Sequence, residues 1–297
     1  MNIYSQIRAN KLKSYFIIFL FIGLISLVFY VIGQYYSDPT TYFIIGLVFA
    51  LFTGITSYFY SDKLVLKMSS AKPASKEKYF DYYTVTENLA IGAGIPMPKL
   101  FVIDDPTPNA FATGRDPKHA VVAATTGLLE RLERSEIEGV IAHELSHVKN
   151  YDILVMTIVT VLVGTVAYAV DFFTRSLWWG GSRDRNNRSG ALGIVFLIFF
   201  IILMPLIASL IQMAVSRRRE FLADASGALL TRNPDALADA LEKISHDPHM
   251  MKHASTATAH LYISNPLKKD SKSRNWITSL FSTHPPIEER VRILRSM

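Results

Sequence analysis

Three residues near the middle of the chain have the types and the spacing that metal-dependent hydrolysis requires. The stretch Ile141-Ala-His-Glu-Leu-Ser-His147 places His143 and His147 four positions apart, so on a helix the two imidazoles lie one above the other on the same face. Both can then reach one zinc ion, while Glu144 between them can act as general base on a metal-bound water. We therefore predict His143 and His147 as metal ligands and Glu144 as the catalytic residue.

This chemistry needs the stretch to be helical, and the flanking sequence favours a helix. Ser135-Glu-Ile-Glu138 has the S-x-x-E form of a capping box, which predicts a helix start just upstream. The alternative is a surface helix that carries two histidines by chance. An apolar face argues against that alternative, and it consists of Ile137, Val140, Ile141 and Val148.

The composition indicates a membrane protein without thiol chemistry. Half of the 297 residues are hydrophobic, and the mean hydropathy of +0.23 is high for a soluble protein. The net charge of +6 could suggest nucleic acid, but the basic residues flank apolar runs, so the lipid bilayer explains them better and no nucleic-acid partner is expected. The absence of cysteine excludes disulfides and thiolate ligands, which leaves His, Glu and Asp to bind a metal.

Two apolar runs near the N-terminus predict a first pair of membrane spans. Residues 15–32 and 41–60 are each about long enough to cross a bilayer. A cleaved signal peptide is the alternative, but the first run is long for one and no small-residue cleavage site follows it. Basic residues flank both outer ends of this hairpin, which predicts that both termini and the catalytic domain are cytoplasmic. These residues are Arg8, Lys11 and Lys13 before it and Lys63, Lys67, Lys72, Lys76 and Lys78 after it.

Two further apolar runs, 153–173 and 191–215, predict a second membrane hairpin. The alternative is a buried hairpin of a soluble core, but the length of the runs and their scarcity of charge favour membrane spans. The loop 174–190 contains four arginines although this topology puts it outside; we let the first hairpin decide the orientation, because it usually dominates. The arginines are Arg175, Arg183, Arg185 and Arg188.

The remaining segments predict a catalytic domain built from two parts of the chain. The first part contains a predicted helix at 76–90, then short strands at 99–103, 109–112 and 119–125 before the motif helix. We therefore expect a mainly α membrane protein with four hydrophobic spans and a cytosolic, zincin-like metalloprotease domain that includes a small β-sheet. The predicted units are the first hairpin 1–60, the catalytic segment 61–152, the second hairpin 153–215 and the catalytic segment 216–297.

A catalytic zinc needs a third protein ligand and one open position for water. Segment 148–219 contains no His and no Glu, and Glu220 is the first Glu after the motif. Asp224, one helical turn later, could accept a hydrogen bond from a ligand histidine and fix its tautomer. Alone, Glu220 would be an ion-pair partner of the preceding arginines and Asp224 a solvated charge. With the motif upstream, we predict that Glu220 is the third ligand of one zinc ion per chain. We predict that Asp224 accepts a hydrogen bond from one of the ligand histidines.

Together these motifs resemble those of the HtpX family of bacterial membrane zinc metallopeptidases, relatives of the CAAX prenyl proteases. The resemblance covers essentially the whole chain. It implies a zinc metalloendopeptidase of the plasma membrane, which acts on membrane or membrane-associated proteins and removes misfolded or damaged ones under stress. It rests on His143-Glu-Leu-Ser-His147, Glu220-Phe-Leu-Ala-Asp224, Pro108-Asn-Ala-Phe-Ala-Thr-Gly114 and Thr283-His-Pro-Pro286 with Arg290.

The resemblance also implies residues that bind substrate. Asn109, Ala110, Phe111 and Ala112 would form an edge strand with which a peptide pairs as an extra strand; an ordinary strand or turn is the alternative. His284 or Arg290 could donate to the oxyanion, although Pro285-Pro286 equally suits a structural helix start.

Two other functions fit parts of the sequence. An intramembrane protease of the site-2 type would have its motif inside a span, but charged Glu136, Glu138 and Lys149 surround this one. A membrane chaperone or scaffold stabilised by zinc would lack proteolytic activity. Structural zinc sites are usually closed by four protein ligands, whereas this sequence offers three and a general base.

Overall fold

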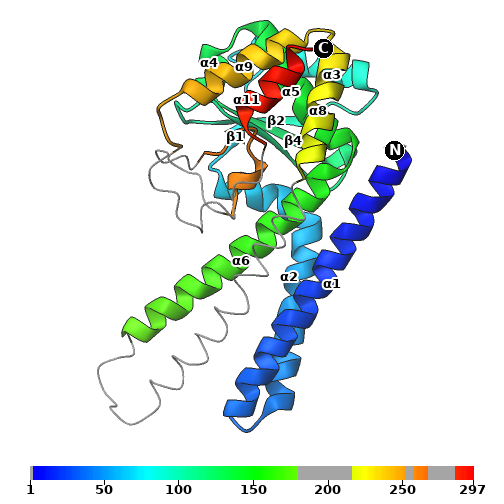
Figure 1. Ribbon diagram of the computed structural model, residues 1–297. Coiled ribbons are helices and arrows are strands. Elements are labelled where there is room, and N and C mark those ends of the chain that lie inside the picture. Colours follow the sequence, from blue (N-terminus) through cyan, green and yellow to red (C-terminus); the bar gives the residue numbers. More distant parts are fainter. Residues whose placement is uncertain (1–2, 180–215, 252–256, 267–284) are drawn as a thin grey trace.

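The computed structural model describes residues 3–179, 216–251, 257–266 and 285–297 (Figure 1). Two long helices, α1 (Ile3–Tyr35) and α2 (Pro39–Met68), run antiparallel from the N-terminus. Asp38 caps α2 by accepting a hydrogen bond from the N–H of Thr41, and Pro39 occupies the first helical turn, where its missing N–H costs nothing. Two antiparallel helices therefore contain the two predicted spans, and each helix is longer than its apolar run.

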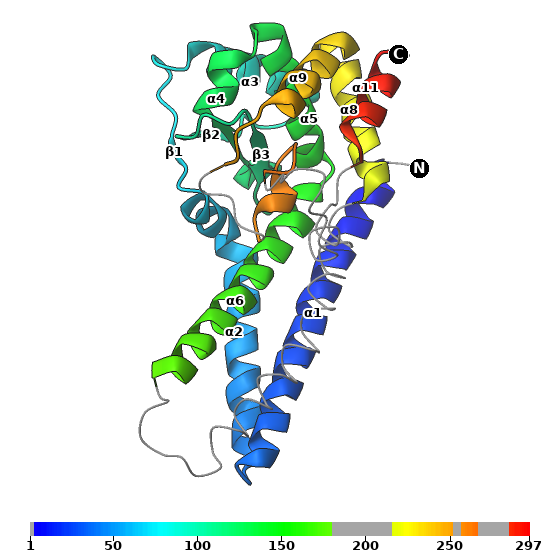
Figure 2. The ribbon, with the colours of Figure 1, turned by 60° about the vertical axis from the view of Figure 1, so that its left-hand side comes forward.

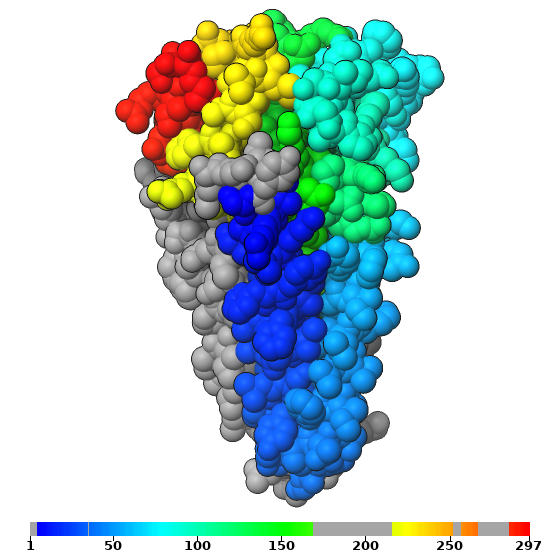
Figure 3. Space-filling model, turned by 90° about the vertical axis from the view of Figure 1, so that its right-hand side faces the viewer, coloured from blue at the N-terminus to red at the C-terminus, as the bar shows by residue number. Residues whose placement is uncertain are grey.

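Both helices are long and apolar enough to cross a membrane. Their outer surfaces carry large apolar side chains that are exposed in the folded chain, as lipid contact requires. Figure 3 shows the two helices, in dark and lighter blue, extending below the part of the chain that is drawn in cyan, yellow and red. Examples are Phe16, Phe19, Leu27, Ile44, Val48, Phe52 and Ile55.

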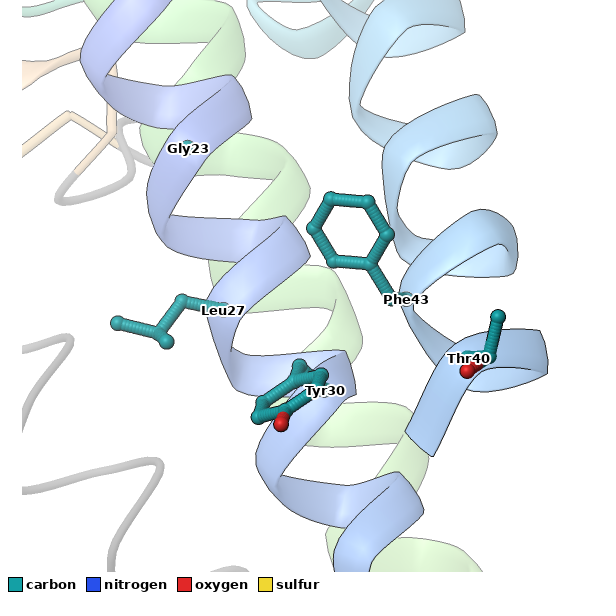
Figure 4. Close-up of a pocket in the computed structure, with 5 residues that line it drawn as sticks. All are labelled: Gly23, Leu27, Tyr30, Thr40 and Phe43. Atoms are coloured by element: carbon teal, nitrogen blue, oxygen red, sulfur yellow. The ribbon is translucent and has the colours of Figure 1, made fainter. Parts of the chain in front are cut away.

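An apolar hollow of about 540 Å³ lies between the far ends of these helices, next to the turn that joins them. Figure 4 shows Phe43 of α2 projecting between α1 and α2. Among the described residues that line it there is no histidine, lysine, arginine, aspartate or glutamate. Its lining consists of Gly23, Leu27, Tyr30, Thr40 and Phe43.

A four-stranded sheet forms the centre of the second part of the structure. Its strands are β1 (Lys72–Pro73), β2 (Lys99–Ile103), β3 (Ala110–Thr113) and β4 (Val121–Thr125), in the order β1-β2-β4-β3. β2 and β4 are parallel, and the other two pairs are antiparallel. Because β3 comes last in the strand order, it is an edge strand. The predicted small sheet before the motif helix is confirmed.

Helices cover the sheet on both faces, so β3 and β4 are entirely buried. One face packs against α3 (Phe80–Ala93) and α5 (Arg134–Lys149), and the other packs against α6 (Asp152–Trp179) and residues 257–262. A short 3-10 turn, η1 (Pro117–His119), and a short helix, α4 (Thr126–Arg131), flank β4. The later elements are α8 (Arg217–Thr231), α9 (Pro234–His246), η2 (Ala259–Leu261) and α11 (Ile287–Leu294).

The motif stretch is helical, as predicted, but its capping box is not the predicted one. Helix α5 begins at Arg134, and Glu133 is its N-cap residue. Glu136 accepts the N–H of Glu133 at 2.7 Å and also forms an ion pair with Lys243 of α9. The Ser135–Glu138 box is therefore wrong: Ser135 already lies inside the first turn, and the tertiary partner on α9 favours Glu136 as the N3 carboxylate.

The chain turns sharply between α5 and α6, whose axes meet at 85°. Tyr151 at this corner has a left-handed backbone, with φ of 60°. α6 then runs along α1 and α2, and its residues 154–166 pack on Ile17, Phe21 and Ile25 of α1 (Figure 2). The third apolar run is thus a helix, which extends to Trp179, beyond the predicted end at 173.

Four membrane spans are not established by this fold. Within the described part of the chain, two helices pass the length and hydropathy test, or three if the bent pair α5–α6 is one span. The predicted fourth run, 191–215, lies outside the described residues.

Candidate metal centre

The site forms where α8 packs against α5. Small residues of α8 allow this approach: a Cβ added to Gly227 would lie 3.1 Å from the backbone nitrogen of His143, closer than ordinary contact. Glu220, two helical turns before Gly227, thereby reaches the face of α5 that carries His143 and His147. The structure thus brings His147 and Glu220 together, which are 73 positions apart and which the sequence analysis predicted as ligands of one ion.

Three donor atoms converge in this interior site. The Nε2 atoms of His143 and His147 are 3.2 Å apart, and the Glu220 carboxylate lies 3.8 Å from the first and 3.6 Å from the second. The three residues are only 1%, 4% and 2% exposed. Zinc–nitrogen distances of about 2.0–2.1 Å in a tetrahedral site put ligand atoms roughly 3.3 Å apart, so this spacing fits one zinc ion.

Each imidazole is fixed by a carboxylate on its other nitrogen. Nδ1 of His143 lies 2.8 Å from Oδ1 of Asp224, and Nδ1 of His147 lies 3.1 Å from Oδ2 of Asp152. Each Nδ1 therefore donates its proton to a carboxylate, and the two Nε2 atoms face each other in the centre, where each can present a lone pair to a metal. Two lone pairs at 3.2 Å beside a carboxylate repel unless a cation or a proton lies between them. The donor set therefore fits a metal.

Asp224 is itself held by Arg290 of α11. The guanidinium donates from Nε and Nη2 to the two carboxylate oxygens at 2.8 and 2.7 Å. Burial would raise the pKa of Asp224, but the charge and hydrogen bonds of Arg290 outweigh it and lower that pKa well below its usual range. Nη2 of Arg290 lies 3.4 Å from Nδ1 of His143, too far to displace the 2.8 Å contact with Asp224.

The predicted role of Arg290 as an oxyanion donor therefore has little geometric support. Its guanidinium lies behind His143, on the side away from the converging Nε2 atoms, and its remaining nitrogen Nη1 donates to the carbonyl of Ile263 at 3.1 Å. The contacts fit an ion pair that positions Asp224. His284, the other predicted donor, lies outside the described residues.

Replacing Arg290 should destabilise the protein strongly. Arg290 is completely buried, and Arg290→Met would leave the Asp224 carboxylate buried without its partner, at an expected cost of about 3–5 kcal/mol in the free energy of unfolding. Urea denaturation of the metal-free protein in detergent measures this. Arg295→Met is the matched control, because Arg295 of the same C-terminal region pairs with Asp235 on the surface; an equal loss in both variants would contradict the buried ion pair.

Glu144 lies beside the three converging donors and is 2% exposed. The backbone N–H of Ala112 in β3 donates to its carboxylate, which ties the general-base candidate to the edge strand. Burial raises the pKa of Glu144, and the imidazoles of His143 and His147 only partly offset this. A carboxyl group that takes up a proton at higher pH than usual suits alternating base and acid roles near neutral pH.

The predicted substrate strand is present, but part of its free edge is already paired. The carbonyl of Ala110 accepts the N–H of Ile263 at 3.0 Å, and the side-chain amide of Asn109 donates to the carbonyl of Ser264 at 2.9 Å. Phe111 packs edge-on against Tyr262. Segment 262–264 therefore covers the start of β3, and Ala112, beside Glu144, is the position closest to the site.

Sequence reasoning missed Asp152. It is the fifth residue after His147 and lies beyond the 85° corner, so no helical periodicity relates the two. The only signal was a carboxylate at the edge of an apolar run, which without a partner looks like an ordinary solvated charge.

Zinc uptake is expected to release a proton. Burial lowers the pKa of His147, but its hydrogen bond to Asp152 and the carboxylate of Glu220 outweigh burial and raise it to about 9. Near pH 7 the metal-free protein therefore holds a proton on Nε2 of His147, which a metal must displace. Calorimetric titration with zinc in buffers of different ionisation enthalpy should show release of about one proton, and affinity should rise with pH up to about 9. Binding enthalpies that do not depend on the buffer would contradict this.

Comparison with known proteins identifies the family of the chain. The model of Peptidase family M48 matches residues 80–297. Curated proteins called "Protease HtpX homolog" are similar over nearly the whole chain. The one from Dictyoglomus turgidum is 46% identical over 294 residues, which are 99% of this chain and 94% of that protein. The one from Tropheryma whipplei (strain Twist) is 46% identical over 300 residues, 99% and 98% of the two chains.

A crystal structure of S. mikatae Ste24p aligns with 98% of this chain and 67% of its own, with a TM-score of 0.49 and 19% identity, a likeness too weak to add to the assignment. The family is one of metallopeptidases, and the group of His143, His147 and Glu220 at the contact of α5 and α8 could hold one metal ion. The chain belongs to peptidase family M48 and is a metallopeptidase with apolar helices that suit a membrane.

Proposed function

We propose that the protein is a zinc-dependent endopeptidase of the plasma membrane, which cuts membrane or membrane-associated proteins from the cytosolic side. The observation that carries the proposal is the buried group of His143, His147 and Glu220 with Glu144 beside it. Helix α5, which carries the two histidines, leads at the 85° corner into α6, and α6 runs along the candidate membrane helices (Figure 1).

The chain's own residues supply the following steps. His143, His147 and Glu220 hold the metal; when bound, zinc would polarise the scissile carbonyl and acidify a water molecule. Glu144 takes the proton of the attacking water and gives it to the leaving amine. Asp224 and Asp152 keep the two imidazoles in the tautomer that presents Nε2 to the metal.

A substrate would pair as an extra strand with the end of β3 around Ala112, beyond the Ala110 carbonyl that Ile263 already occupies. The N–H of Ala112 already points at Glu144, so a peptide along this edge would pass the general base. Because backbone pairing asks for little sequence specificity, an unfolded or damaged segment is a suitable substrate. This supports a role in the quality control of membrane proteins.

Cleavage by the purified protein tests this function. The zinc-loaded chain in liposomes should cut a loosely folded membrane protein and casein, and a chelator should abolish both activities. A protein that binds zinc and cuts neither would instead be a zinc-stabilised chaperone or scaffold.

The orientation has its own test, since the chain lacks cysteine and single cysteines report without background. Ser37→Cys lies at the turn between α1 and α2, and Ser296→Cys lies at the C-terminal end; both positions are exposed. In intact cells a membrane-impermeant maleimide should label the first variant and reach the second only after permeabilisation. The reverse pattern would contradict a cytosolic site.

A further inference from the structure

The N-terminal helix reaches the metal centre. Asn10, near the start of α1, is 4% exposed, although it lies 133 positions before the motif. Its side-chain amide donates to Oδ1 of Asp152 at 2.8 Å and to the carbonyl of Asn150 at 2.9 Å. Asn10 therefore bonds to both ends of the corner between α5 and α6. Figures 1 and 2 show this end of α1 beside the base of the sheet domain.

Asp152 links this contact to a metal ligand. One carboxylate oxygen, Oδ2, accepts from Nδ1 of His147 at 3.1 Å, while the other, Oδ1, accepts from Asn10. Asp152 is 3% exposed, so its orientation depends on these donors rather than on water. Hydrogen bonds thus connect His147 to Asp152 and Asp152 to Asn10, and together they link the metal centre to α1.

Arg219 of α8 also binds to both Asn10 and Asp152. Its Nη1 donates to Oδ1 of Asp152 and to Oδ1 of Asn10, both at 3.3 Å, and Arg219 directly precedes Glu220. Without Asn10, the shortest hydrogen bond to Asp152 is lost, and the guanidinium would draw the carboxylate away from His147. The imidazole would then lose part of its fixed orientation before metal binds.

We propose that Asn10 and Asp152 are positioning residues for His147, so that the N-terminal helix is a part of the metal centre as well as a membrane anchor. This inference rests on His147 being a ligand, as in the proposed function. It implies that metal affinity depends on the docking of α1 against the corner after α5, and that displacement of this helix weakens the centre.

Zinc affinity of the purified full chain in detergent, measured by competition with a chromogenic chelator, tests the proposal. Asp152→Ala should weaken binding about 10–100-fold, the usual effect of removing such a support, and Asn10→Ala by roughly 3–10-fold. Ser14→Ala is the matched control: Ser14 is buried one turn further along α1, and within the described part of the chain its hydroxyl donates to the carbonyl of Asn10 in its own helix and not to Asp152. It should bind zinc as the wild type does.

A double-variant cycle separates positioning from a general loss of stability. If Asn10 acts through Asp152, Asn10→Ala should have little further effect in the Asp152→Ala background. The inference is overturned if Asn10→Ala binds zinc as tightly as Ser14→Ala does, or if its effect persists in full without Asp152. Asn10→Ser, too short to reach Asp152, replaces Asn10→Ala should the latter fail to fold. A wild type that binds no zinc would overturn the proposed function itself.

Discussion

Glu144→Gln should keep its zinc and lose about 10²–10⁴-fold of its proteolytic rate. The amide is nearly isosteric with the carboxylate, so the donors on α5 and α8 are undisturbed, but it cannot take a proton from water. Atomic absorption measures the zinc content, and casein cleavage measures the proteolytic rate. Both are to be measured on the same detergent-solubilised sample.

A conservative control defines the effect of Glu144→Gln. Glu138→Gln changes a half-exposed residue of the same helix, which pairs only loosely with Arg134, and should leave both zinc content and rate unchanged. If Glu144→Gln cleaved casein at the wild-type rate while Glu138→Gln behaved as expected, Glu144 would not be the general base.

Glu220→Ala should lose the metal, and with it all activity. Two imidazoles 3.2 Å apart then remain, with a cavity in place of the third donor. We expect zinc content to fall from about one per chain to nearly zero after dialysis, since catalytic zinc sites generally need three protein ligands. Excess zinc should raise the midpoint of thermal unfolding of the wild type, because binding to the native state alone stabilises it by about 2.7 kcal/mol at 100 times Kd; Glu220→Ala should show no such rise.

The matched control for Glu220→Ala is Glu242→Ala, which removes a half-exposed glutamate of α9 on the surface. It should retain zinc and the zinc-dependent stabilisation. Retention of a full equivalent of zinc by Glu220→Ala would refute Glu220 as third ligand and would direct attention to Asp152, the next nearest carboxylate on His147.

The features that could be predicted from the sequence are those with a local pattern. His143 and His147 are one helical turn apart, so the helix alone aligns them. The two N-terminal helices can be predicted from the length and apolar content of their segments. Glu220 was found because the long apolar stretch after the motif contains no other His or Glu. Its approach to α5 then depends on Gly227, which no local rule singles out.

The remaining features arise from contacts between distant segments. Asn10 and Asp152 are 142 positions apart, and the pairing exists only because α5 and α6 meet at 85° and α1 docks into that corner. The resemblance drew attention to Arg290, but its ion pair with Asp224 exists only because α11 packs against α8. The start of α5 was misplaced for the same reason: Lys243 of α9 helps to select Glu136, not Glu138, as the capping carboxylate.

Zinc X-ray absorption on the protein loaded with one equivalent of metal tests the central claim most directly, because it reports the ligands themselves. The account predicts four light-atom neighbours at about 2.0–2.1 Å with the signature of two imidazoles, unchanged in Glu144→Gln and reduced to one imidazole in any zinc retained by His147→Ala. Three or more imidazoles in the wild type, or a spectrum that His147→Ala leaves unaltered, would contradict a centre built from His143, His147 and Glu220.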